Sequence, residues 1–165
     1  MTKRSMGAWV IVALALVTVR CGDEAEEAEE TGRQAATTVA ERLERATRLS
    51  ATLSGAAEVP TAGDPDGTGT ATVNLDVTKR EVCYEVAVQK IDRPVGMHIH
   101  EGEGGKSGDI VVPLNPPTAR DTTTTGCANV DAGLIGRIAA TPGNFYVNVH
   151  TQTYPQGALR GQLSQ

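Results

Sequence analysis

The stretch "TATVNLDVTKREVCYEVAVQ", residues 70–89, decides the fold of this 165-residue chain. In both of its halves apolar residues occupy every second position, which is the period of a β-strand with one buried face. The polar residues "TKRE", 78–81, interrupt this alternation as a turn does. The side chains that we predict to face the core are Ala71, Val73, Leu75 and Val77 in the first half and Val82, Tyr84, Val86 and Val88 in the second. The stretch therefore predicts a β-hairpin.

Further strands are predicted on both sides of this hairpin. Their segments are "SATLSGAAEV" (50–59), "VGMHIHE" (95–101), "DIVVPL" (109–114), "FYVNVHT" (145–151) and "GALRGQL" (157–163). The segment "DAGLIGRIAAT" (131–141) has the apolar spacing of a short helix or helical turn, and "DTTTTGC" (121–127) is expected to be a polar loop. Because the chain lacks the strand–helix alternation of a parallel sheet, we predict an all-β fold. Short strands at this spacing favour an antiparallel, Greek-key-like β-sandwich with one short helix or helical turn.

The N-terminus carries the pattern of an export signal. Lys3 and Arg4 precede a run of 12 uncharged, mostly apolar residues, "AWVIVALALVTV" (8–19). A bilayer core takes roughly 20 residues to cross, so this run matches the apolar region of a secretory signal peptide better than a membrane span. We predict that residues 1–21 are a signal peptide and that the protein is exported. An uncleaved N-terminal anchor is the alternative.

Cys21 lies at the end of this signal, in "VTVRCGDEAEE" (17–27). The phrase is similar to the junction of a bacterial lipoprotein, in which a cysteine becomes the lipidated first residue. Arg20 departs from that pattern, because lipoprotein signals usually place a small residue before the cysteine. A lipidated Cys21 predicts a lipoprotein held at a membrane of the cell envelope, periplasmic or at the cell surface. The alternative is a secreted protein, cut nearby, with Cys21 removed or left free.

Residues 22–49 are predicted to form an acidic linker, and residues 50–165 to form one domain. The linker begins with a run of six acidic residues in "GDEAEEAEETGRQ" (22–34), which stays solvated, and continues with the spacing of a short helix over 36–49. The domain has 12 acidic and 8 basic residues, a net charge of −4, and no basic stripe. This charge balance argues against nucleic-acid binding.

Two further cysteines, Cys83 and Cys127, lie within the domain. In an oxidising compartment they can pair, and closing the loop between them would constrain the unfolded chain by roughly 4 kcal/mol. Two buried free thiols are the alternative. A lipidated Cys21 would account for the odd number of cysteines.

All three histidines of the chain fall in two short phrases. His98 and His100 alternate with Met97 and Ile99 on one predicted strand and so share a face, about 6.6 Å apart along it. If the strand of His150 is its neighbour, three imidazoles converge and form a zinc or copper site with an open position. The alternatives are a structural role, with one hydrogen bond per ring, and general acid–base catalysis. The sequence favours the structural role, because three ligands are a minimal set.

Several phrases together carry a resemblance to a known family. They are "HIHEGEGGKSGDIVVPL" (98–114), "FYVNVHTQTYPQGALRGQL" (145–163), "LSGAAEVP" (53–60), "CYEV" (83–86) and "GC" (126–127). Over nearly all of residues 50–165 the chain resembles the CHRD domain, named after chordin. The resemblance implies an immunoglobulin-like or superoxide-dismutase-like β-sandwich. It implies no activity, because the domain has no well-established one in bacteria. Chordin carries several copies among cysteine-rich repeats, whereas this chain has one copy behind a bacterial-type export signal, so the growth-factor binding of chordin is not carried over to it.

The same phrases contain residues that we expect to have structural roles. Gly102, Gly104, Gly105 and Gly108 are expected to form a tight loop that needs positive φ or close backbone approach. The final hairpin is expected to be braced by Asn148, Arg160 and Gly161, with Arg160 paired to a carboxylate such as Glu101 or Asp109.

Two functions are consistent with these features. The first is a non-enzymatic binding module at the cell envelope, whose partner is a protein or a glycan, since no complete catalytic set can be assembled from the sequence. The second is a copper or zinc protein, with redox activity as one option, that uses His98, His100 and His150. Convergence of the imidazole nitrogens of both phrases on a common point would favour the second function.

Overall fold

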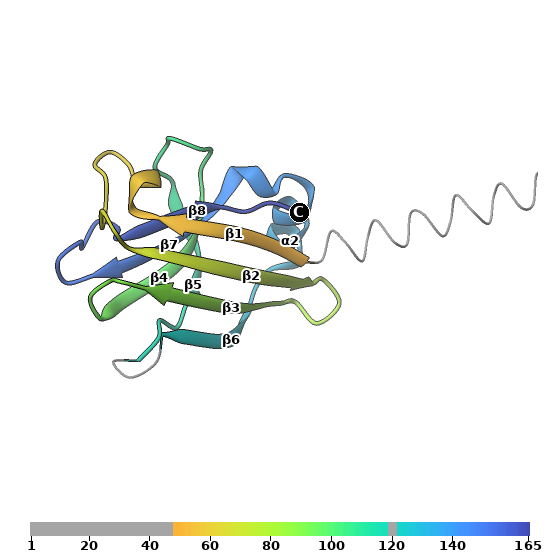
Figure 1. Cartoon of the computed structure of the whole chain (residues 1–165). Coiled ribbons are helices and arrows are strands. Elements are labelled where there is room, and N and C mark those ends of the chain that lie inside the picture. Colours follow the sequence, from red (N-terminus) through yellow and green to blue (C-terminus); the bar gives the residue numbers. More distant parts are fainter. Residues whose placement is uncertain (1–47, 119–121) are drawn as a thin grey trace, which may run out of the picture. The chain divides into compact units, whose positions relative to one another are not determined.

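The computed structural model describes residues 48–118 and 122–165 (Figure 1). The predicted signal peptide, Cys21 and nearly all of the predicted linker lie outside the described residues. The strands of the described part are β1 (Arg48–Ser54), β2 (Thr68–Asp76), β3 (Glu81–Gln89), β4 (Pro94–Glu101), β5 (Asp109–Leu114), β6 (Thr123–Asn129), β7 (Phe145–Thr151) and β8 (Leu159–Gln162). One α-helix, α2 (Ala132–Ala140), and two 3-10 turns, η1 (Gly55–Ala57) and η2 (Pro142–Asn144), complete it. In these residues no helix is long and apolar enough to span a membrane.

All strand pairings are antiparallel, in the order β5-β4-β7-β8-β1-β2-β3-β6. Two four-stranded halves, β5-β4-β7-β8 and β1-β2-β3-β6, are joined where Ser54 of β1 pairs with Arg160 of β8. Figure 1 shows the halves as two layers. The chain passes from one half to the other between β3 and β4, between β5 and β6, and between β6 and β7, as in a Greek key. The predicted all-β, antiparallel sandwich with one short helix is confirmed.

Alternation of apolar residues builds the core between the layers. In β2 and β3 the inward side chains are buried and their neighbours are half-buried or exposed, as period two predicts. Helix α2 adds Ile135 and Ile138, which are fully buried, to this core. The carboxylate of Asp131 starts the helix by accepting a hydrogen bond from the amide of Gly133 at 2.8 Å.

The segment predicted to be a polar loop, "DTTTTGC", is mostly a strand, and that prediction was wrong. Strand β6 pairs with β3 along its whole length and forms an edge of the sheet. Its half-buried positions carry only small side chains, so the sequence shows no apolar alternation there. A Cβ at Gly126 would lie 2.5 Å from Oη of Tyr84, so β3 supplies the bulk that β6 lacks.

Several boundaries also differ from the sequence prediction, and the strand predicted over 50–59 ends at Ser54, before the 3-10 turn η1. Val77 was expected to face the core, but its side chain is 50% exposed, because β2 ends at Asp76. The carboxylate of Asp76 accepts a hydrogen bond from the amide of Lys79 at 2.8 Å, which turns the chain there. Strand β1 begins at Arg48, so residues 48 and 49, assigned to the linker, belong to the sheet.

A disulfide joins Cys83 of β3 to Cys127 of β6, as the sequence predicted. The two cysteines are directly opposite in the strand register and 44 residues apart in the chain. The bond therefore fixes an edge strand that has few apolar contacts of its own.

Replacing both cysteines by alanine is expected to lower the free energy of unfolding by about 3–4 kcal/mol, because the unfolded chain loses a cross-link over a long loop. Urea unfolding followed by circular dichroism measures this difference. Reduction of the wild-type disulfide should give a loss of similar size. Equal stability of the oxidised wild type and the double variant would contradict the prediction.

Candidate metal centre

The three histidines lie on the outer face of two paired strands. In β4, Met97 and Ile99 are buried in the core, so His98 and His100 point to the opposite face. Strand β7 pairs with β4 so that His150 lies opposite Gly96. The strand of His150 is thus the direct neighbour of the strand that carries the other two.

The three imidazoles converge. One ring nitrogen of each of His98, His100 and His150 lies within 4.8 Å of the others. The ring centroids are 5.7 Å apart for His98 and His100, 5.2 Å for His98 and His150, and 6.4 Å for His100 and His150. Three atoms this close all lie within about 2.8 Å of a common centre, and zinc–imidazole bonds are about 2.0–2.1 Å long. Shifts of less than about 1 Å would therefore bring all three into bonding distance of one ion.

Backbone carbonyls determine which nitrogen of two of these rings carries the proton. Nδ1 of His100 lies 2.9 Å from the carbonyl oxygen of Gly108, and Nδ1 of His150 lies 3.1 Å from that of Pro155. A carbonyl only accepts hydrogen bonds, so each Nδ1 is the donor and each Nε2 carries a lone pair. Histidines that bind metals typically have this arrangement, with the second nitrogen donating to a carbonyl.

The remaining nitrogens of the cluster have no hydrogen-bond partner. Nδ1 of His98 and Nε2 of His100 and His150 are buried, and they are the unsatisfied buried side-chain atoms in the part of the chain that the structure describes. A buried polar atom without a partner costs about 1–3 kcal/mol. Three such atoms, one from each ring of a converging set, are what a bound cation would satisfy.

The electrostatics of the cluster keep the rings neutral. Burial lowers the pKa of each of the three histidines below its ordinary value of 6.5. Repulsion from the neighbouring imidazoles lowers the pKa of His98 and His150 further. At neutral pH the nitrogen lone pairs are therefore free to bind a metal.

A layered stack holds the ring of His100. The ring of Tyr146 is parallel to it, with an interplanar angle of 9° and centroids 4.8 Å apart. The guanidinium of Arg160 lies over the ring of Tyr146, 3.5 Å from its centroid. Arg160 is 2% exposed and is held by hydrogen bonds of 2.9 Å to the carbonyl of Glu103 and to Oε1 of Gln162. The stack fixes the plane in which His100 presents its free nitrogen.

The prediction that Arg160 pairs with a carboxylate such as Glu101 or Asp109 was wrong. Its side chain bonds neither Glu101 nor Asp109, because it turns over Tyr146 instead. Glu101 forms an ion pair of 3.1 Å with Arg137 of α2. Within the described ranges, no carboxylate belongs to the histidine set.

Two of the predicted loop glycines have identifiable roles. Gly105 has a φ of 77°, a region that favours glycine. A Cβ at Gly108 would lie 1.7 Å from the carbonyl oxygen of Glu101, so only glycine lets this backbone approach closely. That approach brings the carbonyl of Gly108 to His100. Gly102 is half-buried in the same loop, and Gly161 packs against the backbone of β1, where a Cβ would lie 2.3 Å from the carbonyl oxygen of Thr52.

Glu58, which the sequence did not single out, lies next to this layer. Its side chain accepts a hydrogen bond from Nδ2 of Asn148, which lies opposite His98 in the register. Glu58 is 7% exposed, and burial raises its pKa to about 7, against the opposing effects of Arg160 and Asn148. The one signal in the sequence was a single charged residue within the small-residue run "GAAEVP".

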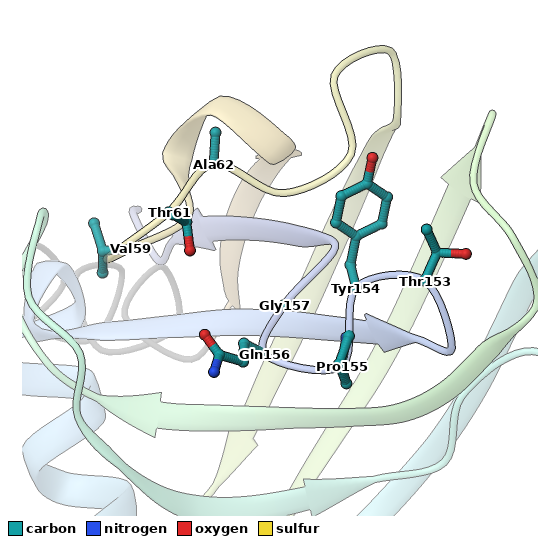
Figure 2. A pocket seen from close by; sticks show the side chains of 8 residues that line it. All are labelled: Val59, Thr61, Ala62, Thr153, Tyr154, Pro155, Gln156 and Gly157. Atoms are coloured by element: carbon teal, nitrogen blue, oxygen red, sulfur yellow. The ribbon is translucent and has the colours of Figure 1, made fainter.

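A pocket of about 220 Å³ is formed partly by the loop whose Pro155 carbonyl contacts His150. Segments 59–62 and 153–157 form its walls, and Figure 2 shows their side chains around the pocket. Pro155 lines the pocket, and its carbonyl is the one that His150 contacts. The pocket and the histidine cluster therefore share one structural element.

A second group of ligand-type side chains is made of Glu81, Cys83 and Cys127. Its two sulfur atoms are bonded to each other, so neither is a thiolate that can bind a metal. The histidine cluster is the stronger candidate.

Comparison with known proteins gives one match. The family model of the CHRD domain matches residues 49–163, well over half of the chain. The match covers all three histidines, both cysteines of the disulfide and Glu58. No curated protein matches the chain, and no solved structure matches it.

Glu58→Gln is expected to reduce the dependence of stability on pH. The pKa of Glu58 is raised from 4.5 to about 7, so its contribution is fully present below pH 4.5 and is lost as pH rises through 7. The wild type should lose about 2 kcal/mol more than the variant between these values. Urea unfolding at pH 5 and pH 8 measures the difference, with Glu85→Gln, at an exposed position of β3, as the control. Equal losses in wild type and Glu58→Gln would refute the assignment.

Gly108→Ala is expected to disturb His100, because the new Cβ forces the backbone away from Glu101. A cost of about 2 kcal/mol in unfolding free energy is expected from such overpacking. Nitrogen NMR of the imidazole should show that Nδ1 of His100 loses its fixed proton. Gly104→Ala is the matched control, since its Cβ would meet nothing closer than 4.0 Å. The prediction fails if the two variants behave alike.

Proposed function

The chain belongs to the CHRD domain family, and we propose that its domain is a metal-binding module that holds one zinc or copper ion between His98, His100 and His150. One observation carries the proposal: one ring nitrogen of each histidine lies within 4.8 Å of the others, and each of the three rings has one buried nitrogen without a hydrogen-bond partner. The carbonyls of Gly108 and Pro155 support it, because they hold Nδ1 of two rings and leave each Nε2 with a free lone pair.

The structural alternative accounts for less of the geometry. Single hydrogen bonds to carbonyls explain Nδ1 of His100 and His150. They leave three buried nitrogens unsatisfied, at about 1–3 kcal/mol each. Metal binding, which the sequence ranked second, is therefore the function that the geometry favours.

The ligand chemistry favours zinc or copper over other ions. Imidazole suits both metals, whereas calcium and magnesium take oxygen ligands. Among the residues described, no carboxylate joins the set. Three neutral imidazoles are also the protein ligands of zinc sites that keep a fourth position open.

We further propose that the domain works outside the cytoplasm. The disulfide between Cys83 and Cys127 supports this location, because such bonds persist in oxidising compartments. The apolar run at 8–19 supports it as an export signal. Lipidation of Cys21 and a protein or glycan partner at the cell surface stay predictions.

Metal titration of the full chain tests the proposed function. The protein is purified with a histidine-free tag, stripped with a chelator and titrated with Zn²⁺ and Cu²⁺ by calorimetry. We expect one ion per chain. Loss of a residue that merely supports a ligand costs about 10–100-fold in affinity, so each of His98→Ala, His100→Ala and His150→Ala should cost at least about 100-fold. Elemental analysis of protein purified without added metal identifies the ion.

Glu81→Gln is the matched control, since it alters the other group of ligand-type residues and should leave the affinity unchanged. Circular dichroism verifies that each variant is folded. Wild-type stoichiometry and affinity in the folded histidine variants would refute the proposal.

A further inference from the structure

We infer that Tyr146 is the positioning residue of the histidine centre: it holds the imidazole of His100 with its ring and, through Gly108, with its hydroxyl. The inference rests on the proposed metal-binding function. It adds a residue outside the ligand set on which the affinity of the site for its ion depends.

The place of Tyr146 in the sheet makes the first contact possible. Strand β7 lies between β4 and β8, and Tyr146 is directly opposite His100 of β4 in the strand register. The two rings are nearly parallel, with an interplanar angle of 9° and centroids 4.8 Å apart. Rotation of the His100 ring out of this plane therefore loses the stacking contact.

The hydroxyl of Tyr146 makes the second contact, which reaches His100 through the backbone. Its oxygen accepts a hydrogen bond of 3.2 Å from the amide of Gly108. The carbonyl oxygen of the same glycine lies 2.9 Å from Nδ1 of His100 and accepts a hydrogen bond from it. Tyr146 thus supports both the plane of the imidazole and the choice of the nitrogen that carries the proton.

Tyr146 is itself held from the other side. The guanidinium of Arg160 reaches it from β8 and lies 3.5 Å from the centroid of its ring. Arg160 donates a hydrogen bond of 2.9 Å to the carbonyl of Glu103, in the loop that covers the ring. A Cβ at Gly102 would lie 3.2 Å from Cε1 of Tyr146, so the backbone of that loop packs against the ring. The tyrosine is therefore a fixed support.

His100 is the most firmly held of the three histidines. It is 9% exposed, whereas His98 and His150 are only partly buried. A side chain that is already fixed in one orientation loses little rotamer entropy when an ion binds, so the support for His100 raises the affinity of the site. Groups that orient metal-binding histidines typically contribute about 10–100-fold to affinity.

The test compares two tyrosines of the full chain that make the same kind of hydrogen bond. Tyr84, in the other half of the sheet, is 4% exposed like Tyr146, and its hydroxyl accepts a hydrogen bond of 2.8 Å from the amide of Asn115. Tyr146→Phe and Tyr84→Phe each remove one such bond and should lower the thermal midpoint by similar amounts. In calorimetry only Tyr146→Phe should weaken Zn²⁺ binding, by about tenfold. Tyr146→Leu also loses the stacking contact and should weaken binding by about 100-fold.

A second measurement uses the chelator-stripped protein. Nitrogen NMR of the imidazoles reports which nitrogen of His100 carries the proton. We expect a fixed proton on Nδ1 in the wild type and in Tyr84→Phe, and a partial shift of the proton to Nε2 in Tyr146→Phe. A loss of stability alone does not produce this shift.

The outcomes separate this inference from the proposed function. A wild-type Zn²⁺ affinity in folded Tyr146→Phe and Tyr146→Leu overturns the inference and leaves metal binding intact. Equal losses of affinity in Tyr146→Phe and Tyr84→Phe also overturn it, because the effect is then one of stability. Failure of the wild type to bind Zn²⁺ or Cu²⁺ refutes the proposed function. An unchanged Nδ1 proton in Tyr146→Phe refutes the role of Tyr146 whether or not an ion binds.

Discussion

The antiparallel pairing of β4 with β7 is the interaction on which the histidine cluster depends. Burial of Met97 and Ile99 in β4 and of Val147 and Val149 in β7 fixes its register. A slip of one residue would move each side chain to the other face and send the histidines into the core. The alternation that builds the core therefore also sets which residues meet on the outer face, without any metal to assemble them.

Loops then convert this outer face into a second, polar layer. Tyr146 and Asn148 point away from the core, yet they are 4% and 3% exposed, because the segment 102–108, Glu58 and the side chains of β8 cover them. Strand β7 is thus buried on both faces. The close backbone approach at Gly108 supplies the carbonyl that orients the imidazole of His100.

The fold was predictable from the sequence because strand periodicity is a local signal. Strand β6 escaped prediction because its inward positions carry small side chains. The convergence of His150 with His98 and His100 depends on strand order, which alternation does not encode. The contacts around the histidines, such as the hydrogen bond between Glu58 and Asn148, could not be predicted for the same reason. These two residues are 90 positions apart in the chain. The sequence thus identified the three candidate ligands but gave neither their geometry nor the residues that orient them.

The position of the cluster separates metal binding from folding. The core lies on the opposite face of β4 and β7 from the histidines, and the disulfide lies in the other half of the sheet. In zinc fingers the ion supplies the folding energy that a small core cannot. In this domain hydrophobic burial and the disulfide stabilise the fold without an ion. The three histidine nitrogens that lack a hydrogen-bond partner therefore cost free energy of folding and have a role other than stability. A cluster preformed in this way agrees with the proposed metal site, since the scaffold does not depend on an ion to fold.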